Sequence, residues 1–222
     1  MMVYHFTSSA FGINNIALRR LKISRFNELN DPFELLAADL LDPRHRFSLQ
    51  KHKDEIHNTY GMICFSSSWK NPLLWGHYAE KHKGMALGFE VPEGFLFKVN
   101  YKTERFKVLF DAKKGEVKDG EHVIERLLTT KFKDWEYEQE YRLLIPLSGK
   151  TSENGLFFEY FSEILILREV ILGLKSELDL GQVKKLFGEG PESVRLKKAG
   201  RALRKFSVIE DRAARAALKS ST

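Results

Sequence analysis

Hydrophobic and polar residues alternate over many short stretches of this chain, which is the pattern of half-buried β-strands. Gly, Pro, Asn and Ser separate most of these stretches. Strands are predicted at residues 3–7, 61–68, 84–91, 96–102, 106–110, 135–142, 157–161, 169–173, 193–200 and 204–210. Apolar residues at helical spacing predict helices at residues 13–24, 71–82, 122–135 and 176–188, and a polar helix is expected at 44–59.

The strands outnumber the helices and do not alternate regularly with them. This pattern favours an α+β fold with mostly antiparallel, curved sheets and flanking helices over a doubly wound fold. We expect one domain over residues 1–222, in which residues 195–222 form a basic C-terminal strand and helix segment.

Composition indicates where in the cell the protein is expected. Hydrophobic residues make up 43% of the chain, enough for a substantial core. No stretch approaches the ~20 apolar residues of a membrane span, and the start lacks the features of a signal peptide. Cys64 is the single cysteine and cannot form an internal disulfide. We therefore expect a cytoplasmic protein that does not bind membranes; its oligomeric state is open.

Positive charge is concentrated at the C-terminal end. Residues 195–222 contain nine Lys or Arg and two acids, a net +7, whereas the whole chain carries +6, so the preceding residues sum to −1. Such a segment suits a nucleic acid or another polyanion. An ordinary solvated surface is the alternative, because no aromatic platform accompanies the charges.

Common cofactor motifs are missing. The sequence has no phosphate-binding loop of the P-loop type and no G-x-G-x-x-G between a strand and a helix. His77 and His82 lie five residues apart, so they do not share the helix face that a zinc-protease site requires. We therefore predict no metal site from these motifs.

The stretch "WEYEQEYR" carries the most unusual pattern. In a strand, Glu138 and Glu140 would lie side by side on one face, with Arg142 next in line. Two adjacent carboxylates form either a solvated edge or a working site, and Arg142 could hold Glu140 in a plain ion pair. Two further polar clusters, around His5 and at Ser66, Ser67 and Ser68, lie on other predicted strands.

Several longer motifs resemble one bacterial family. They are "YHFTS", "FNELNDPFEL", "CFSSSWKNPLLWGHYAEKHKGMALGFEV", "WEYEQEYR" and "EVILG". Together they look like domain of unknown function 2971, which includes the AbiGi-type abortive-infection proteins. The resemblance runs over most of the chain and implies a role in antiphage defence, but no activity.

The order of His, a Ser-rich strand and Glu-x-Glu is also similar to the ADP-ribosyltransferase superfamily. That resemblance implies an ADP-ribosyltransferase-like fold and NAD as substrate. It assigns binding of the nicotinamide-side ribose to His5 and support of the nicotinamide pocket to Ser66 or Ser67. Glu140 would stabilise the oxocarbenium-like transition state, and Glu138 would orient the acceptor. Thr7, Trp75 and Tyr78 are the further pocket candidates.

The leading hypothesis is an NAD-dependent ADP-ribosyltransferase or NAD glycohydrolase that modifies a nucleic acid or a protein. It predicts that Glu138 and Glu140 lie within reach of His5 and the Ser66–Ser68 strand, on one side of the sheet. One alternative is a non-catalytic module that binds a nucleotide or nucleic acid. Another is a metal-dependent nuclease or phosphotransferase, in which Asp31, Glu34 and the Glu-x-Glu pair hold a divalent cation. Against that alternative, we expect Asp31 to cap a helix and Phe33 to be buried.

Overall fold

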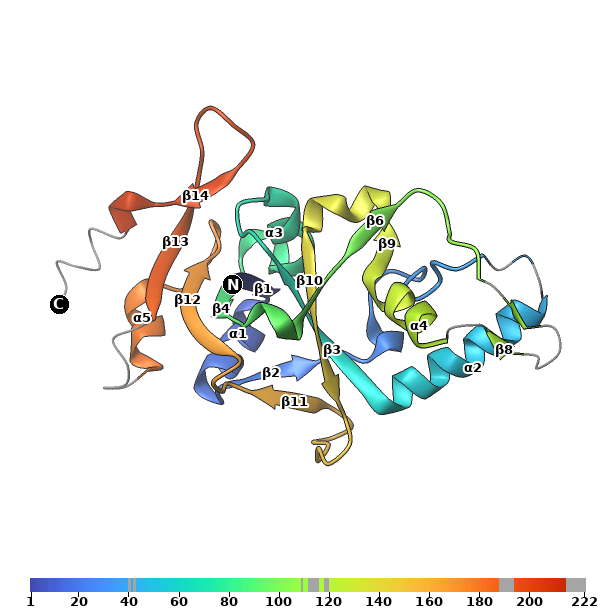
Figure 1. Ribbon diagram of the computed structural model, residues 1–222. Coiled ribbons are helices and arrows are strands. Elements are labelled where there is room, and N and C mark those ends of the chain that lie inside the picture. Colours follow the sequence, from blue (N-terminus) through green and yellow to red (C-terminus); the bar gives the residue numbers. More distant parts are fainter. Residues whose placement is uncertain are drawn as a thin grey trace.

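The computed structural model describes residues 1–39, 41, 43–108, 110–111, 116–117, 120–187 and 194–214. Its centre is an eight-stranded sheet with the order β14-β13-β12-β4-β1-β3-β10-β5 (Figure 1). These strands are β1 (Met2–Thr7), β3 (Tyr60–Ser66), β4 (Met85–Glu90), β5 (Leu96–Lys98), β10 (Glu140–Pro146), β12 (Ile166–Leu172), β13 (Arg195–Arg201) and β14 (Val208–Glu210). Within this sheet β12 and β13 pair in parallel and the other neighbours are antiparallel. The predicted α+β class is confirmed.

The remaining elements cover the two faces of the sheet. The α-helices are α1 (Ser9–Ala17), α2 (Pro43–Thr59), α3 (Pro72–Tyr78), α4 (Gly120–Thr129) and α5 (Leu180–Lys185). Short 3₁₀ helices are η1 (Phe26–Glu28), η2 (Glu80–His82), η3 (Glu93–Phe95) and η4 (Lys133–Glu138). Further strands form three small pairs: β2 (Arg20–Ile23) with β11 (Phe157–Tyr160), β6 (Asn100–Lys102) with β9 (Thr130–Phe132), and β7 (Phe110–Asp111) with β8 (Glu116–Val117). No helix in the described residues is long and apolar enough to cross a membrane.

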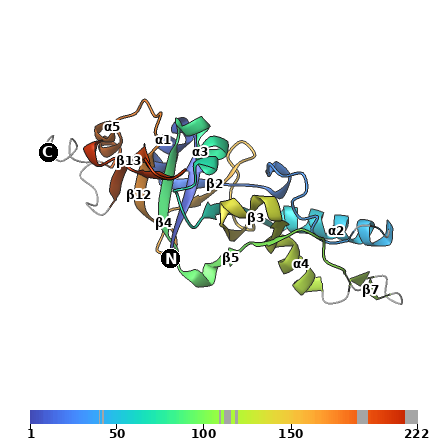
Figure 2. The same cartoon turned by 90° about the horizontal axis from the view of Figure 1, so that it is seen from above.

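Hydrophobic packing differs between the two faces. The largest cluster lies on one face and joins Leu87, Phe65 and Leu143 of the sheet to Leu21 of β2 and Val183 of α5. The opposite face carries two smaller clusters, one beneath α4 and one around α3. Figure 2 shows α5 and β13 at one end of the molecule and α2, α4 and β7 at the other. The candidate site lies between the two smaller clusters.

The sheet opens between β1 and β3. These strands share one pairing, Tyr4 with Ser66. Farther along β3 the same edge is taken by Ser24, whose backbone exchanges two hydrogen bonds with Met62, of 2.9 and 3.0 Å. Between these two points the carbonyl of Cys64 faces the Nδ1 atom of His5 at 3.1 Å. The gap therefore admits a side chain where a continuous sheet would have a neighbouring strand.

Two helices end earlier than predicted, and a strand follows each of them. The helix predicted at 13–24 ends at Ala17, because Arg19 adopts a left-handed backbone with φ 48°, and β2 follows. The helix predicted at 122–135 ends at Thr129, and the next residues form β9 beside β6. Both corrections follow from long-range strand pairing that helical spacing does not show.

The stretch predicted as a strand at 135–142 is also different. Residues Lys133–Glu138 form the 3₁₀ helix η4, and Gln139 has a left-handed backbone with φ 47°. The strand β10 begins only at Glu140. Glu138 and Glu140 are therefore not alternate residues of one strand, although both side chains are buried.

The strands predicted in the basic C-terminal segment are present as β13 and β14, and they pair as an antiparallel hairpin. Its charges are partly used within the protein. Lys197 Nζ lies 2.8 Å from Glu169, and Lys198 donates to the carbonyl of Ser176 at 2.8 Å. Arg195 also pairs with Glu169, at 2.6 Å. The part of the segment at 215–222 lies outside the described residues.

Candidate active site

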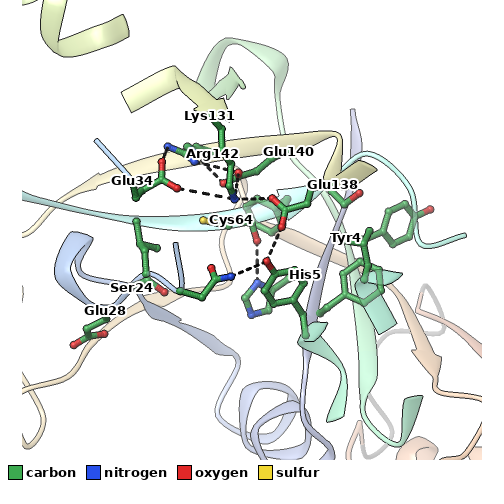
Figure 3. A pocket seen from close by; sticks show the side chains of 17 residues that line it. Tyr4, His5, Ser24, Glu28, Glu34, Cys64, Lys131, Glu138, Glu140 and Arg142 are labelled. Carbon is green, nitrogen blue, oxygen red and sulfur yellow. Dashed lines mark hydrogen bonds and ion pairs between the residues drawn. The ribbon is translucent and has the colours of Figure 1, made fainter. Parts of the chain in front are cut away.

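A cavity of about 290 Å³ lies where β1 and β3 separate, and side chains from β1, β3, β10, α3, β9 and η4 line it (Figure 3). Register explains part of this convergence. Tyr4 pairs with Ser66, and Ser66 pairs on its other side with Glu140, so the three residues lie in one row across the sheet. Three segments, each more than 60 residues from the next in sequence, thus meet at one point.

Lys131 joins the two glutamates. Its Nζ lies 2.6 Å from Glu138 Oε2 and 3.2 Å from Glu140 Oε2, and all three side chains are buried. The left-handed turn at Gln139 directs both carboxylates toward the same ammonium group. Lys131 also lies 4.9 Å from the ring centre of Trp135, a cation–π contact. The surrounding carboxylates raise the pKa of Lys131 despite its burial, so it stays charged.

Arg142 holds Glu140 from the other side. Its Nε donates to Glu140 Oε1 at 2.8 Å and its Nη2 to Oε2 at 3.1 Å, a two-pronged contact. Burial alone would raise the pKa of Glu140, but the charges of Arg142 and Lys131 lower it to about 2. Glu140 is therefore ionised and fixed in position at neutral pH.

Glu34 is the third buried carboxylate of this group. Its Oε1 lies 2.8 Å from Arg142 Nη1 and forms an ion pair without a well-aligned hydrogen bond. The same Nη1 donates to the carbonyl of Leu128 at 2.7 Å. Lys131 is 4.0 Å from its other oxygen. Burial raises the pKa of Glu34, so this carboxylate is less strongly held in its charged form than Glu140.

Tyr78 connects α3 to the charged group. Its hydroxyl lies 2.5 Å from Glu138 Oε1 and accepts a hydrogen bond from Asn30 Nδ2 at 3.1 Å. Burial, followed by the charge of Glu138, raises the pKa of Tyr78, so the hydroxyl keeps its proton. Both oxygens of Glu138 are thus engaged, one by a phenol and the other by Lys131.

His5 reaches the cavity from the opposite face of the sheet. It follows Tyr4 in β1, and its ring packs edge-to-face with Phe65, at 6.1 Å between centroids. The prediction that His5 and Glu140 lie on one side of the sheet is wrong, because strand alternation places them on opposite sides. This departure counts against the transferase hypothesis. The two residues line the same cavity because the sheet is open between β1 and β3. Burial lowers the pKa of His5, which fits a neutral ring donating to the Cys64 carbonyl.

The cavity wall carries excess negative charge. Its ionisable acids are Glu28, Glu34, Glu138 and Glu140, against the cations Lys131 and Arg142, a net −2 with every group ionised. Lys22, outside the lining, pairs with Glu28 at 2.8 Å and reduces the excess to −1. Such a wall favours a ligand with a positive or developing positive charge and disfavours a phosphate group.

The other residues predicted for this site are dispersed. Ser66 lines the cavity, but Ser67 is outside it and donates to Gln139 Oε1 at 2.8 Å. Thr7 lies at the end of β1, also outside the cavity. Trp75 is fully buried, and its indole NH donates to the carbonyl of Trp69 at 2.7 Å. Trp75 is therefore a core residue that has no surface available for a cofactor.

The alternative of a metal site is disfavoured, because a positively charged side chain already lies where the proposed metal ligands converge. Glu34, Glu138 and Glu140 do come together, but the ammonium of Lys131 lies among them. In the described residues no group of three or more His, Cys, Asp or Glu is arranged to hold a metal ion. Asp31 accepts from the backbone NH of Phe33 at 2.9 Å and so stabilises a turn; no helix follows, and Phe33 is 63% exposed instead of buried.

Of the two cations that organise the site, sequence reasoning missed Lys131, whereas the expected ion pair of Arg142 with Glu140 is present. Lys131 falls in a predicted helix, and nothing in its neighbourhood distinguishes it from Lys133. Arg142 was recognised only as a possible partner of Glu140. Asn30 is absent from the predicted site, although its side chain donates to the Tyr78 hydroxyl. Strand register and the β6–β9 pairing bring these residues together, and a single sequence shows neither.

Comparison with known proteins supports the family resemblance. Residues 74–143 match the family described as "Protein of unknown function (DUF2971)". The matched span runs from α3 into β10 and contains Tyr78, Lys131, Glu138, Glu140 and Arg142. No curated protein and no solved structure matches the chain significantly.

Proposed function

We propose that this protein is an ADP-ribosyltransferase-like enzyme that cleaves NAD at the bond between nicotinamide and ribose. The observation that carries the proposal is the cavity shared by His5, Ser66 and the pair Glu138 and Glu140. Their segments follow the order along the chain on which the superfamily resemblance rests, and β1, β3 and β10 are consecutive neighbours in the sheet. Transfer to an acceptor or to water would release nicotinamide.

The electrostatics of the cavity suit this reaction. The nicotinamide ring of NAD is cationic, and breaking its glycosidic bond builds positive charge on the ribose. A wall with net negative charge stabilises both species, whereas it would repel the phosphates, which must stay toward solvent. A cavity of about 290 Å³ is at the small end for ligand sites and fits the nicotinamide riboside end of the molecule.

Each cavity residue has its own role in the proposed reaction. Glu140 stays ionised beside the ribose, because Arg142 and Lys131 hold its pKa near 2. Glu138 orients the incoming nucleophile and takes its proton, and Tyr78 fixes the carboxylate in place. His5 and Ser66 contact the nicotinamide ribose and ring. Thr7, Ser67 and Trp75 take no part, since they lie outside the cavity.

A non-catalytic nucleotide-binding module is the second candidate. It is favoured by the contact between Glu140 and Arg142, because a carboxylate held at both oxygens by one guanidinium serves stability even without chemistry. Such a module would bind NAD or a related nucleotide and leave it intact. The two candidates therefore differ in nicotinamide release and not in binding.

The test compares two glutamates of the same segment. Glu138→Gln keeps the shape of a buried carboxylate in the cavity, whereas Glu136→Gln alters an exposed one that pairs with Lys133 at 2.6 Å. Nicotinamide released from NAD is measured by chromatography, with circular dichroism to verify folding. We expect the wild type and Glu136→Gln to turn over NAD, and Glu138→Gln to lose about 100-fold or more. Equal turnover by folded Glu138→Gln would remove this residue from the mechanism, and binding without turnover by the wild type would favour the module.

A further inference from the structure

A second hollow, of about 330 Å³, lies on the surface beside the cavity. We call it the hairpin hollow. Its walls come from the loop at 66–72, from the end of η4 at Tyr137 and Gln139, and from Phe206 and Ser207 at the end of the β13–β14 turn. Ser66 lines both the hollow and the cavity, so a ligand of the hollow lies next to the candidate active site. The turn projects from the body of the protein near α3 (Figure 1).

Hydrogen bonds fix these walls to one another. Val208 N donates to the carbonyl of Lys70 at 2.8 Å, which ties the hairpin to the loop. Asn71 Nδ2 donates to the carbonyl of Tyr137 at 3.0 Å, which ties the loop to η4. The same Asn71 accepts from Leu73 N as the N-cap of α3. The hollow is thus formed before any ligand binds.

Folding does not account for the aromatic side chain at its edge. Phe206 is fully exposed, at 103% of its reference area, although a phenyl ring gains most by burial. Tyr137 lines the same hollow and is only partly buried. The remaining lining is polar, with Ser68, Asn71 and Gln139. The ring of Tyr137 packs against Trp135, at 5.9 Å between centroids, whereas that of Phe206 is left free. A free aromatic ring beside a polar floor suits a flat, polar ligand.

Cations surround the same edge. Lys70 lines the hollow, and Arg204 and Lys205 precede Phe206 in the turn; all three are exposed. Among the described residues, no carboxylate forms an ion pair with any of them. This distinguishes them from Lys197 and Lys198, whose ammonium groups are bound within the protein. The free positive charge of the hairpin is therefore at its turn.

We propose that the hairpin hollow binds single-stranded nucleic acid and that this strand is the acceptor of the transferred ADP-ribose. Aromatic rings stack on the faces of unpaired bases, and the lysines and arginine contact phosphates. A duplex hides its base faces, so it gains the phosphate contacts alone. The choice of acceptor rests on the proposed function, whereas binding of the strand in the hollow does not.

The charges of the cavity and of the hairpin hollow suit different ligands, NAD in the first and a nucleic-acid strand in the second. The cavity wall is negative and disfavours a phosphate backbone, whereas the hollow has Lys70, Arg204 and Lys205 around it. A strand in the hollow would reach Ser66, from which a base or a ribose hydroxyl can extend toward Glu138. Donor and acceptor thus have sites of opposite charge that share one wall.

The aromatic contact is tested by binding in the absence of NAD. Fluorescence anisotropy is measured with labelled single strands of about 12 nucleotides and with a duplex of the same length. Phe206→Ala is compared with Leu203→Ala, because Leu203 is 99% exposed in the same turn but does not line the hollow. We expect the wild type to prefer the single strand, Phe206→Ala to bind about tenfold more weakly, and Leu203→Ala to bind like the wild type.

The charges are tested by a matched pair of triple variants. Lys70, Arg204 and Lys205 are replaced by Ala in one, and the exposed Lys51, Lys184 and Lys185 in the other. The first should flatten the salt dependence by about two units of slope and the second should not. Equal effects of the paired variants, no preference over duplex, or preference for an acidic peptide would overturn the proposal. Nicotinamide release by the wild type is measured in parallel. Strand binding without nicotinamide release would exclude the proposed transferase but keep the proposed strand site. Nicotinamide release without strand binding would exclude the strand site but keep the transferase.

Discussion

At the residue scale, the ion pairs around Lys131 are the main feature that the sequence does not reveal. Lys131 and Lys133 each lie 2.6 Å from a glutamate, but the first pair is buried and the second is exposed. Removing one member of a buried pair leaves an uncompensated charge in a medium of low polarity, whereas an exposed charge is solvated by water. The two lysines thus form a natural comparison within one segment.

We predict that Lys131→Met lowers the free energy of unfolding by about 3–5 kcal/mol. The control, Lys133→Met, should change it by less than about 1 kcal/mol. Urea denaturation followed by circular dichroism measures both. Similar small losses in the two variants would show that the buried carboxylates do not depend on Lys131 for their stability.

The pKa of Glu140 leads to a pH-dependent prediction. Its value falls from 4.5 to about 2 on folding, so its contribution to stability is present above pH 4.5 and disappears as the pH falls toward 2. The contribution amounts to about 3 kcal/mol. Glu34 has a raised pKa, so its contribution has the opposite sign and is lost as the pH rises through its folded pKa.

Glu140→Gln should therefore flatten the loss of stability between pH 4.5 and pH 2, and it should destabilise the protein at pH 7 because Arg142 loses one of its two carboxylate partners. Glu34→Gln is the control, and it should keep that acid dependence. Urea denaturation at a series of pH values measures the slopes. An unchanged slope in Glu140→Gln would show that another group controls the acid transition.

At the element scale, the junction of η4 and β10 decides where the two glutamates point. Gln139 has φ 47°, a conformation that glycine adopts easily and that β-branched residues avoid. Gln139→Gly should leave stability almost unchanged, whereas Gln139→Val should cost roughly 1–3 kcal/mol. Both variants lose the hydrogen bond from Ser67, so the difference between them isolates the backbone. Equal stabilities in urea denaturation would contradict the left-handed turn.

Elements with strong local signals were predictable from the sequence. The strands β3, β13 and β14 and the helix α3 all lie within or close to the ranges that the pattern predicted. By contrast, β2 alternates buried Leu21 and Ile23 with exposed Lys22. This alternation is too short to be recognised within a stretch that also has helical spacing. The segment 133–138 was misassigned because alternating Glu and aromatic residues suit a strand locally, and tertiary contacts of Glu138 override that preference.

The site itself was predictable only in outline. His5, Ser66, Glu138, Glu140 and Tyr78 were named from the sequence and line one cavity. The partners that set their charge and position come from β9, from Asn30 and Glu34 after η1, and from the register of β10 with β3. Those contacts depend on how distant segments pair, which the spacing of residues along the chain does not encode.

At the scale of the whole molecule, the opening between β1 and β3 combines both faces of the sheet in one site. Ser24 and Tyr4 pair with β3 on either side of Cys64, and His5 fills the space between them. The negative cavity and the positive hairpin turn lie on the two sides of Ser66. This arrangement connects a binding surface for a polyanion to a cavity for a cationic group.

The central claim is that this cavity receives the nicotinamide end of NAD, and the melting temperature tests it most directly. A ligand that binds only the folded state stabilises it by about 2.7 kcal/mol at 100 times its dissociation constant. For a protein of this size that corresponds to a rise of roughly 5–10 °C. We predict such a rise with NAD and a clearly smaller one with ADP-ribose, which lacks the cationic ring. No rise with millimolar NAD, or an equal rise with both ligands, would contradict the account.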